Sequence, residues 1–272
     1  MDGRLQRRVQ RYGWDKAAAY YETYWRRQLE PVQSQLLRQA SAQPGESVLD
    51  VACGTGLITF PVAEQVGSTG SVLGVDLSEG MIQGARAIAA TRGIANTRFE
   101  RMDAEALALP DATFDAALCA LGLMYVPDPR RALSEMHRVV KPGGRVVASV
   151  WGRRANCGWA EIFPIVDARV RSEVCPMFFQ LGNGDALQGE LEAAGFADIT
   201  SERISVRLIY STADDACGAA FDGGPVALAV SRFDNNVRAQ VRDEYLASVQ
   251  AYREGTGYAI PGEFVVASGR KP

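Results

Sequence analysis

An acidic residue followed by a glycine-rich turn is the first feature of this sequence that could bind a ligand. Apolar, β-branched residues lead to Asp50, and the turn after it contains Gly54, Thr55 and Gly56. A turn of this kind, between a strand and a helix, lets a ligand approach bare backbone N–H groups. Glycine pairs also occur in tight turns that bind nothing, so the two glycines alone do not predict a ligand.

A second apolar stretch, residues 71–76, ends in Asp76, twenty positions after Gly56. In a parallel βαβ unit the end of the second strand lies beside the glycine-rich turn, where a carboxylate can accept both hydroxyl groups of a ribose. Two residues argue against NAD. Thr59 stands where the dinucleotide motif has its third glycine, and Asp50 would repel a pyrophosphate but attract a sulfonium. These two residues therefore favour S-adenosylmethionine over NAD as the cofactor.

Five segments together carry a family resemblance. They are residues 48–58, 72–81, 103–110, 114–119 and 133–144. As a set they resemble the motifs of the class I S-adenosylmethionine-dependent methyltransferases, with Ala52 where the first motif often has glycine. Within that class the resemblance is closest to the quinone-biosynthesis-like small-molecule methyltransferases, and it covers about residues 45–150.

The resemblance implies a cofactor site at the carboxyl ends of the strands. Asp103 would accept from the adenine amino group while the Ala104 N–H meets a ring nitrogen; the other interpretation of Asp103 is an ordinary helix N-cap. Tyr21 matches a tyrosine often found in the arm that closes over the cofactor. The expected cofactor-binding residues are Tyr21, Asp50, Ala52, Gly54, Thr55, Gly56, Asp76, Leu77, Met81, Asp103, Ala104 and Ala120.

Strand and helix patterns alternate from residue 46 to residue 151, which predicts a parallel sheet with helices on both faces. The expected fold class is therefore α/β, a Rossmann-like seven-stranded sheet with a small helical cap. The resemblance adds the strand order 3-2-1-4-5-7-6 with strand seven antiparallel. Pro31 predicts a break between two helices, and the non-periodic residues 1–12 are predicted to be frayed.

The expected organisation is one methyltransferase domain, residues 1–272, with an N-terminal helical arm at 1–42. Two cap insertions, 152–184 and 211–232, leave the sheet after strands five and six and can return over the strand ends. Their aromatic residues either pack a small cap or wall an apolar acceptor pocket. The residues expected to line that pocket are Met124, Trp159, Phe163, Phe179 and Phe221.

Composition excludes several partners. The net charge of −3 and the lack of Lys/Arg clusters with interleaved aromatic residues argue against nucleic acid. Residues 120–123 also lack the Asn/Asp-Pro-Pro-aromatic turn of the base methyltransferases. No apolar run is long enough to span a bilayer and the N-terminus has no signal-peptide pattern, so a cytoplasmic location is expected.

No metal is expected, because no His, Asp or Glu residues are grouped with ligand spacing and the five cysteines include no C-x-x-C pair. Cys157, Cys175 and Cys217 leave a thiolate site for a soft metal or metalloid open. The only histidine, His137, is predicted to be exposed.

The expected function is transfer of a methyl group from S-adenosylmethionine to a small, apolar or aromatic acceptor by in-line displacement. No catalytic residue is identified, because alignment and desolvation can supply most of the rate. The alternatives are a nucleotide-dependent oxidoreductase, a thiolate-based metalloid methyltransferase and a non-catalytic adenosyl binder.

Overall fold

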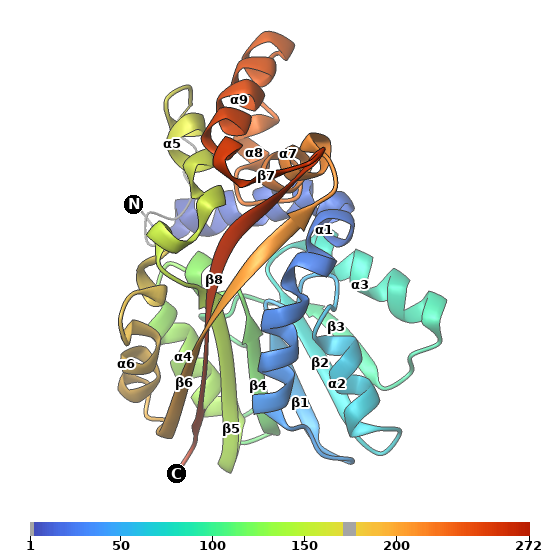
Figure 1. Ribbon diagram of the computed structural model, residues 1–272. Coiled ribbons are helices and arrows are strands. Elements are labelled where there is room, and N and C mark those ends of the chain that lie inside the picture. Colours follow the sequence, from blue (N-terminus) through green and yellow to red (C-terminus); the bar gives the residue numbers. More distant parts are fainter. Residues whose placement is uncertain (1–2, 171–177) are drawn as a thin grey trace.

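The computed structural model describes residues 3–170 and 178–272, which form a central sheet with helices on both faces (Figure 1). The strand order is β3-β2-β1-β4-β5-β8-β6, and the short β7 pairs with β8. Strands β1 to β5 are parallel, and β8 is antiparallel to both β5 and β6. The expected strand order is confirmed, with β8 as the long seventh strand. The strands are β1 Ser47–Val51, β2 Ser71–Asp76, β3 Thr97–Arg101, β4 Phe114–Ala120, β5 Val140–Trp151, β6 Ala197–Tyr210, β7 Arg253–Glu254 and β8 Gly257–Arg270.

The helices cover the faces of the sheet and its upper end. The central strands β1 and β4 are apolar and buried almost throughout because helices cover both of their sides. Figure 1 shows α5, α7, α8 and α9 above the end of the sheet where β5 finishes and β8 begins. The helices after the first are α2 Thr59–Val66, α3 Glu79–Arg92, α4 Pro129–Val139, α5 Ile162–Asp167, α6 Ala186–Ala193, α7 Ala213–Phe221, α8 Ala227–Val230 and α9 Asn235–Ser248.

The N-terminal helix α1 is continuous over Gly3–Ala40. Two sequence-based expectations are therefore wrong: residues 3–12 are helical, and Pro31 does not divide the helix. A proline inside a helix removes one backbone hydrogen bond. Burial of neighbouring apolar side chains offsets this loss, since Leu29 and Val32 are 2 % and 1 % exposed. Figure 1 shows α1 crossing the upper end of the sheet near its N-terminus and then descending beside the strands.

Polar contacts hold the C-terminal half of α1 against the edge of the sheet. The Gln28 side-chain amide donates to the Ile209 carbonyl oxygen at 2.6 Å, and its oxygen accepts from the Ile209 N–H at 2.8 Å. These two bonds satisfy backbone groups on the outer edge of β6, as a neighbouring strand would. The position of α1 over the strand ends is thereby tied to the sheet.

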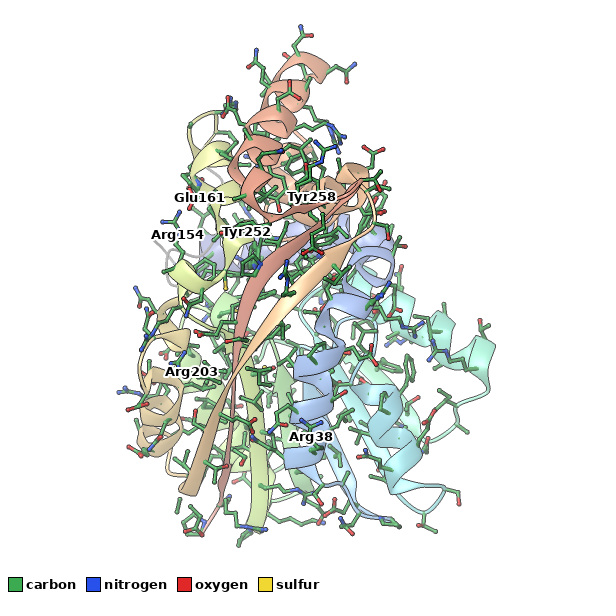
Figure 2. The ribbon with its side chains drawn as sticks, viewed as in Figure 1. Arg38, Arg154, Glu161, Arg203, Tyr252 and Tyr258 are labelled. Atoms are coloured by element: carbon green, nitrogen blue, oxygen red, sulfur yellow. The ribbon has the colours of Figure 1, made fainter. Side chains whose placement is uncertain are left out.

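Contacts to β8 and to the residues just before it position the segment that follows β5. Glu263 of β8 accepts from the Arg153 N–H at 2.9 Å and from Arg203 at 3.0 Å. A Cβ atom at Gly158 would lie 2.6 Å from the Tyr252 ring, so glycine lets the two segments approach closely. Figure 2 labels Arg203 and Tyr252, and it shows the side chains that fill the space between sheet and helices.

Within residues 3–170 and 178–272, no helix has both the length and the apolar character that crossing a membrane requires.

Candidate functional site

A cavity of about 1050 Å³, part of it open to solvent, lies at the carboxyl ends of the parallel strands beneath the N-terminal half of α1. Its lining comes from α1, from the residues after β1, β2, β3 and β4, and from the segments after β5 and α7. Ligands of open parallel sheets bind at this end of the strands. The fold therefore places the cavity where the sequence predicts a ligand.

Asp76 connects the glycine-rich turn to the end of β2. Its carboxylate accepts from the Gly54 N–H at 2.9 Å and from the Ser78 N–H at 2.8 Å, one bond to each oxygen. Burial raises the pKa of Asp76 to about 6, although both backbone N–H groups favour the charged form. Each oxygen keeps acceptor capacity for a ligand hydroxyl group.

Asp103 follows β3 and begins a turn rather than a helix, so the alternative of a helix N-cap is wrong. Its carboxylate accepts from the Glu105 N–H at 3.0 Å and pairs with the Arg7 guanidinium, also at 3.0 Å. Arg7 further pairs with the Glu105 carboxylate at 2.7 Å. The first turns of α1 are thus attached to the strand ends by charge.

Most of the predicted cofactor-binding residues lie together around this cavity. Ala52 has a left-handed φ of 57°, which is costly for a residue other than glycine and recurs at ligand sites. The predicted residues that line the cavity are Tyr21, Ala52, Gly54, Asp76, Leu77, Met81, Asp103, Ala104 and Ala120.

Asp50 does not line the cavity. Its side chain points toward the first residue of α2, where it accepts from the Thr59 hydroxyl at 2.6 Å. It is fully buried, and its second oxygen has no hydrogen-bond partner among the described residues. Burial raises the pKa of Asp50 to about 7. The Asp50 carboxylate therefore has no direct contact with the cavity, where it was predicted to attract a sulfonium.

Asp50 should make the stability of the protein depend on pH. Its pKa is about 7 in the folded protein but about 3.9 in an unfolded chain. The folded state therefore binds the proton more tightly, so the free energy of unfolding falls as pH rises from about 4 to about 7 and then levels off. In Asp50→Asn this decrease in the free energy of unfolding, on the order of 3–4 kcal/mol, should be absent. Urea unfolding of both proteins across this pH range measures it; parallel curves would contradict the assignment.

Thr55 and Gly56 support the turn but are absent from the cavity lining. The Thr55 hydroxyl donates to the Glu22 carboxylate of α1 at 2.6 Å. Gly56 has a φ of +97°, and a Cβ atom there would lie 2.6 Å from the Phe60 ring. Glycine is therefore needed at this position for the backbone and for close packing.

A further contact attaches the middle of α1 to the rim of the cavity. The Asp15 carboxylate accepts from the Ser78 hydroxyl at 2.6 Å and from the Gly80 N–H at 3.0 Å. Ser78 in turn caps α3 by accepting from the Met81 N–H. Together with the contacts of Arg7 and Glu22, this bond holds α1 over the strand ends.

Tryptophans form much of the apolar lining. All four tryptophans of the chain, Trp14, Trp25, Trp151 and Trp159, line this cavity. Trp25 makes edge contacts with both Trp151 and Trp159, with ring centroids 6.0 and 6.3 Å apart. Edge contacts of this kind add to the stability gained by burying the rings. The cavity therefore has an acidic side, with Asp76 and Asp103, and an aromatic side formed by the tryptophans.

The structure places some of the predicted acceptor residues in the cavity lining and others outside it. Met124 and Trp159 line the cavity, whereas Phe163, Phe179 and Phe221 do not. Phe163 and Phe179 pack against the Trp159 ring, with centroids 5.6 and 5.8 Å away, and Phe221 packs against Tyr245. For these three phenylalanines the cap-packing interpretation fits the structure.

Several lining residues were not identified from the sequence. Six of them belong to α1, whose first turns were expected to be frayed; the others include Trp151 at the end of β5 and the Gly224–Pro225 pair. Helical periodicity in the first twelve residues is the signal that could have found the earliest members of the α1 group, but it is weak there. The residues missed on α1 are Arg7, Gln10, Arg11, Trp14, Trp25 and Leu29.

The cysteines do not form a thiolate site in the described part of the chain. Cys157 and Cys217 are buried, and burial raises their pKa values to about 12 and about 11. Cys175 lies outside the described residues. Among residues 3–170 and 178–272, no group of three or more His, Cys, Asp or Glu side chains could hold a metal ion. His137 is half-buried beside Phe196, away from the cavity lining.

Comparison with known proteins agrees with this geometry. Residues 48–144 match the family described as "Methyltransferase domain". The chain is 37 % identical over 127 residues to a demethylmenaquinone methyltransferase of Geobacillus sp. (strain WCH70), covering 47 % of this chain and 54 % of the relative. It is 27 % identical over 255 residues to the nocamycin O-methyltransferase of Saccharothrix syringae, covering 89 % and 91 %. The chain spans about half the length of the first curated relatives it matches.

A solved structure shares the fold over nearly the whole chain. It is phosphoethanolamine N-methyltransferase 2 of Haemonchus contortus, in complex with phosphomonomethylethanolamine and S-adenosylhomocysteine. The TM-score is 0.62 at 18 % identity, and the match covers 95 % of this chain and 57 % of that one. The matched family, the motifs and the strand order together identify residues 48–144 as a methyltransferase domain with the fold and motifs of the class I S-adenosylmethionine-dependent methyltransferases.

Proposed function

We propose that this chain transfers a methyl group from S-adenosylmethionine to a small aromatic acceptor. The observation that supports this most is that one cavity joins the acidic strand ends, with Asp76 and Asp103, to the tryptophan wall. A cofactor on the acidic side and an acceptor on the aromatic side would therefore share an enclosed space. Apolar pockets with a few placed polar groups are the usual sites for small molecules.

The acidic side has the groups that an adenosine requires. Asp76 can accept from both ribose hydroxyls, and Asp103 and Ala104 line the same cavity with a carboxylate and an N–H group that could bind an adenine edge. Gly54 has a φ of +55°, and Tyr21 lies over it, 3.8 Å from where a Cβ atom would stand. When bound there, S-adenosylmethionine supplies an electrophilic methyl group on a positively charged sulfur.

The residues around the cavity act by orientation and by exclusion of water. Tyr21 and Trp14 of α1 make an edge contact, with ring centroids 5.8 Å apart, and both line the covered side of the cavity. Holding two reactants in line can contribute up to roughly 7–11 kcal/mol to the lowering of a barrier. A rate enhancement of that origin needs no dedicated catalytic side chain.

The described lining offers no ready general base. Asp76 is held by two backbone N–H groups, and Asp103 and Glu105 are paired with Arg7. Burial and the charge of Asp76 raise the pKa of Tyr21 well above its usual range, so its hydroxyl stays neutral. An acceptor is therefore expected to react through an atom that is already nucleophilic at neutral pH.

The experiment that tests this function has two parts. Calorimetry should show that S-adenosylmethionine binds more tightly than NAD. Incubation with labelled cofactor and a panel of phenols, quinols, aromatic acids, amines and thiols should then label at least one aromatic acceptor. Tighter binding of NAD would instead support the nucleotide-dependent oxidoreductase, and cofactor binding without any labelling would support a non-catalytic adenosyl binder.

The contact between Asp15 and the start of α3 should slow release of the cofactor. Asp15→Ala removes the bonds to the Ser78 hydroxyl and the Gly80 N–H, and loss of hydrogen bonds to a charged group costs about 1.5–3 kcal/mol. We expect dissociation of S-adenosylmethionine to become about tenfold faster, measured by stopped-flow fluorescence of the cavity tryptophans. Lys16→Ala, at an exposed neighbouring position of α1, is the control. Equal rates in both variants would mean that this bond does not hold the cofactor in.

A further inference from the structure

Arg11 is a lining residue of the cavity that has no acidic partner in the described part of the chain. It lines the cavity from α1, and its guanidinium carbon lies 4.5 Å from the centroid of the Tyr12 ring. Tyr12 is 45 % exposed and does not line the cavity, so the guanidinium lies over a ring at the protein surface. One turn earlier, Arg7 is paired with the carboxylates of Asp103 and Glu105. Within residues 3–170 and 178–272, no ion pair engages Arg11, so its charge is available to a ligand.

Gln10, the neighbour of Arg11, adds an amide to the same lining. It is 7 % exposed and lines the cavity. No hydrogen bond engages its side chain among the described residues, and its amide atoms are not enclosed as the Gln6 Nε2 is. An accessible amide that borders a cavity can donate to, and accept from, a polar group of a ligand.

The tryptophan-lined part of the cavity suits a flat apolar body. Trp25, Trp151 and Trp159 are 6 %, 3 % and 3 % exposed; Trp25 makes edge contacts with the other two, which are tilted against each other. A ring system bound against them would share the cavity with the polar groups of the first turns of α1. The cavity therefore combines an aromatic surface with a free cation and a free amide.

We propose that the acceptor is an aromatic acid, and that Arg11 and Gln10 bind its carboxylate or an equally acidic oxygen group. This inference rests on the proposed methyl transfer and names its substrate class. Guanidinium–carboxylate pairs are strong because the bonds are charge-assisted and two can form in parallel. The amide of Gln10 can donate a further bond to the same oxygens.

Binding of a matched pair of probes tests this without requiring turnover. Naphthoate and naphthamide have the same ring system and differ in charge. Each is titrated into the full chain saturated with S-adenosylhomocysteine at neutral pH, and quenching of tryptophan fluorescence is followed. The readout is local to the site, because every tryptophan of the chain lines this cavity. We expect naphthoate to bind about tenfold more tightly than naphthamide, or better.

Arg11→Gln should remove that preference by weakening naphthoate binding about tenfold while leaving naphthamide unchanged. Arg8→Gln, at an exposed position of the same helix outside the cavity lining, should keep the preference. Equal affinity of the two probes for the wild type, an equal loss in both variants, or no binding of either probe would overturn the proposal. Calorimetry of S-adenosylhomocysteine alone separates the two levels: if it binds but the acid is not preferred, only the acceptor class is wrong.

Discussion

Replacing Asp76 with alanine is expected to weaken S-adenosylmethionine binding by about 30- to 150-fold, the range that corresponds to losing about 2–3 kcal/mol of hydrogen bonding to a charged group. The Asp76 carboxylate both faces the cavity and accepts from the Gly54 and Ser78 N–H groups. Its removal would take away the ribose acceptor and also release two backbone donors that shape the site. Isothermal titration of the purified variant measures the change.

The control for this prediction is Asp111→Ala. Asp111 is a carboxylate whose side chain is 75 % exposed and pairs with Arg138, and neither residue lines the cavity. Its removal should leave the affinity for the cofactor unchanged, because exposed ion pairs contribute little. Thermal unfolding of both variants shows whether they remain folded at the titration temperature. An affinity for Asp76→Ala equal to that of the control would remove Asp76 from the cofactor site.

The same carboxylate should make cofactor binding depend on pH. Burial raises the pKa of Asp76 to about 6 in the free protein, and ribose hydroxyls bind its charged form better. Affinity should therefore rise as pH increases toward about 6 and level off above it. In Asp76→Ala this rise should be absent. If the wild-type affinity did not change between about pH 5 and about pH 7, the range around a pKa of about 6, Asp76 would not change its charge on binding.

The residues near the glycine-rich turn could be predicted because the sequence places them at consecutive strand ends. Gly54, Asp76 and Asp103 each come within a few residues of the end of a parallel strand, and parallel pairing brings those ends together. The orientation of individual residues escaped this reasoning, since Thr55, Gly56 and Asp50 do not line the cavity. Asp50 is still paired with β2 and β4 near the end of β1, and its side chain faces α2.

The roof of the cavity could not be predicted in the same way. Arg7 and Gln10 reach the site because α1 is held across the strand ends by contacts between residues far apart in the chain, such as the bond from Thr55 to Glu22. A local pattern gives a helix and one buried face. It does not give the surface against which that face packs, so residues of α1 were assigned to frayed or core positions.

The aromatic residues after β5 show a related limit. Composition indicated that residues 152–184 contribute rings to a cap, but not which ring faces the ligand space. Trp159 lines the cavity, while Phe163 and Phe179 lie behind it. Trp159 is buried and the two phenylalanines are partly buried, but all three have the same local sequence character, so only their tertiary positions separate lining from support.

That separation gives the second large expected effect. Trp159→Ala should lower kcat/KM for the aromatic acceptor found in the labelling panel by about 100-fold. Without the Trp159 ring to pack against, the acceptor is no longer held in line with the methyl group. Cofactor affinity should stay near wild type, since Asp76 and the turn are untouched. Phe179→Ala is the matched control: its ring contacts Trp159 at 5.8 Å but does not line the cavity. Trp159→Ala removes a buried ring and should cost up to about 3–5 kcal/mol of stability, and Phe179→Ala removes a partly buried ring and should cost less. Steady-state kinetics, normalised to the folded fraction, therefore distinguish the two roles. If Phe179→Ala lost as much activity per folded molecule as Trp159→Ala, the aromatic cluster would act as a unit, and the acceptor would have to contact α1 rather than the wall formed by Trp159.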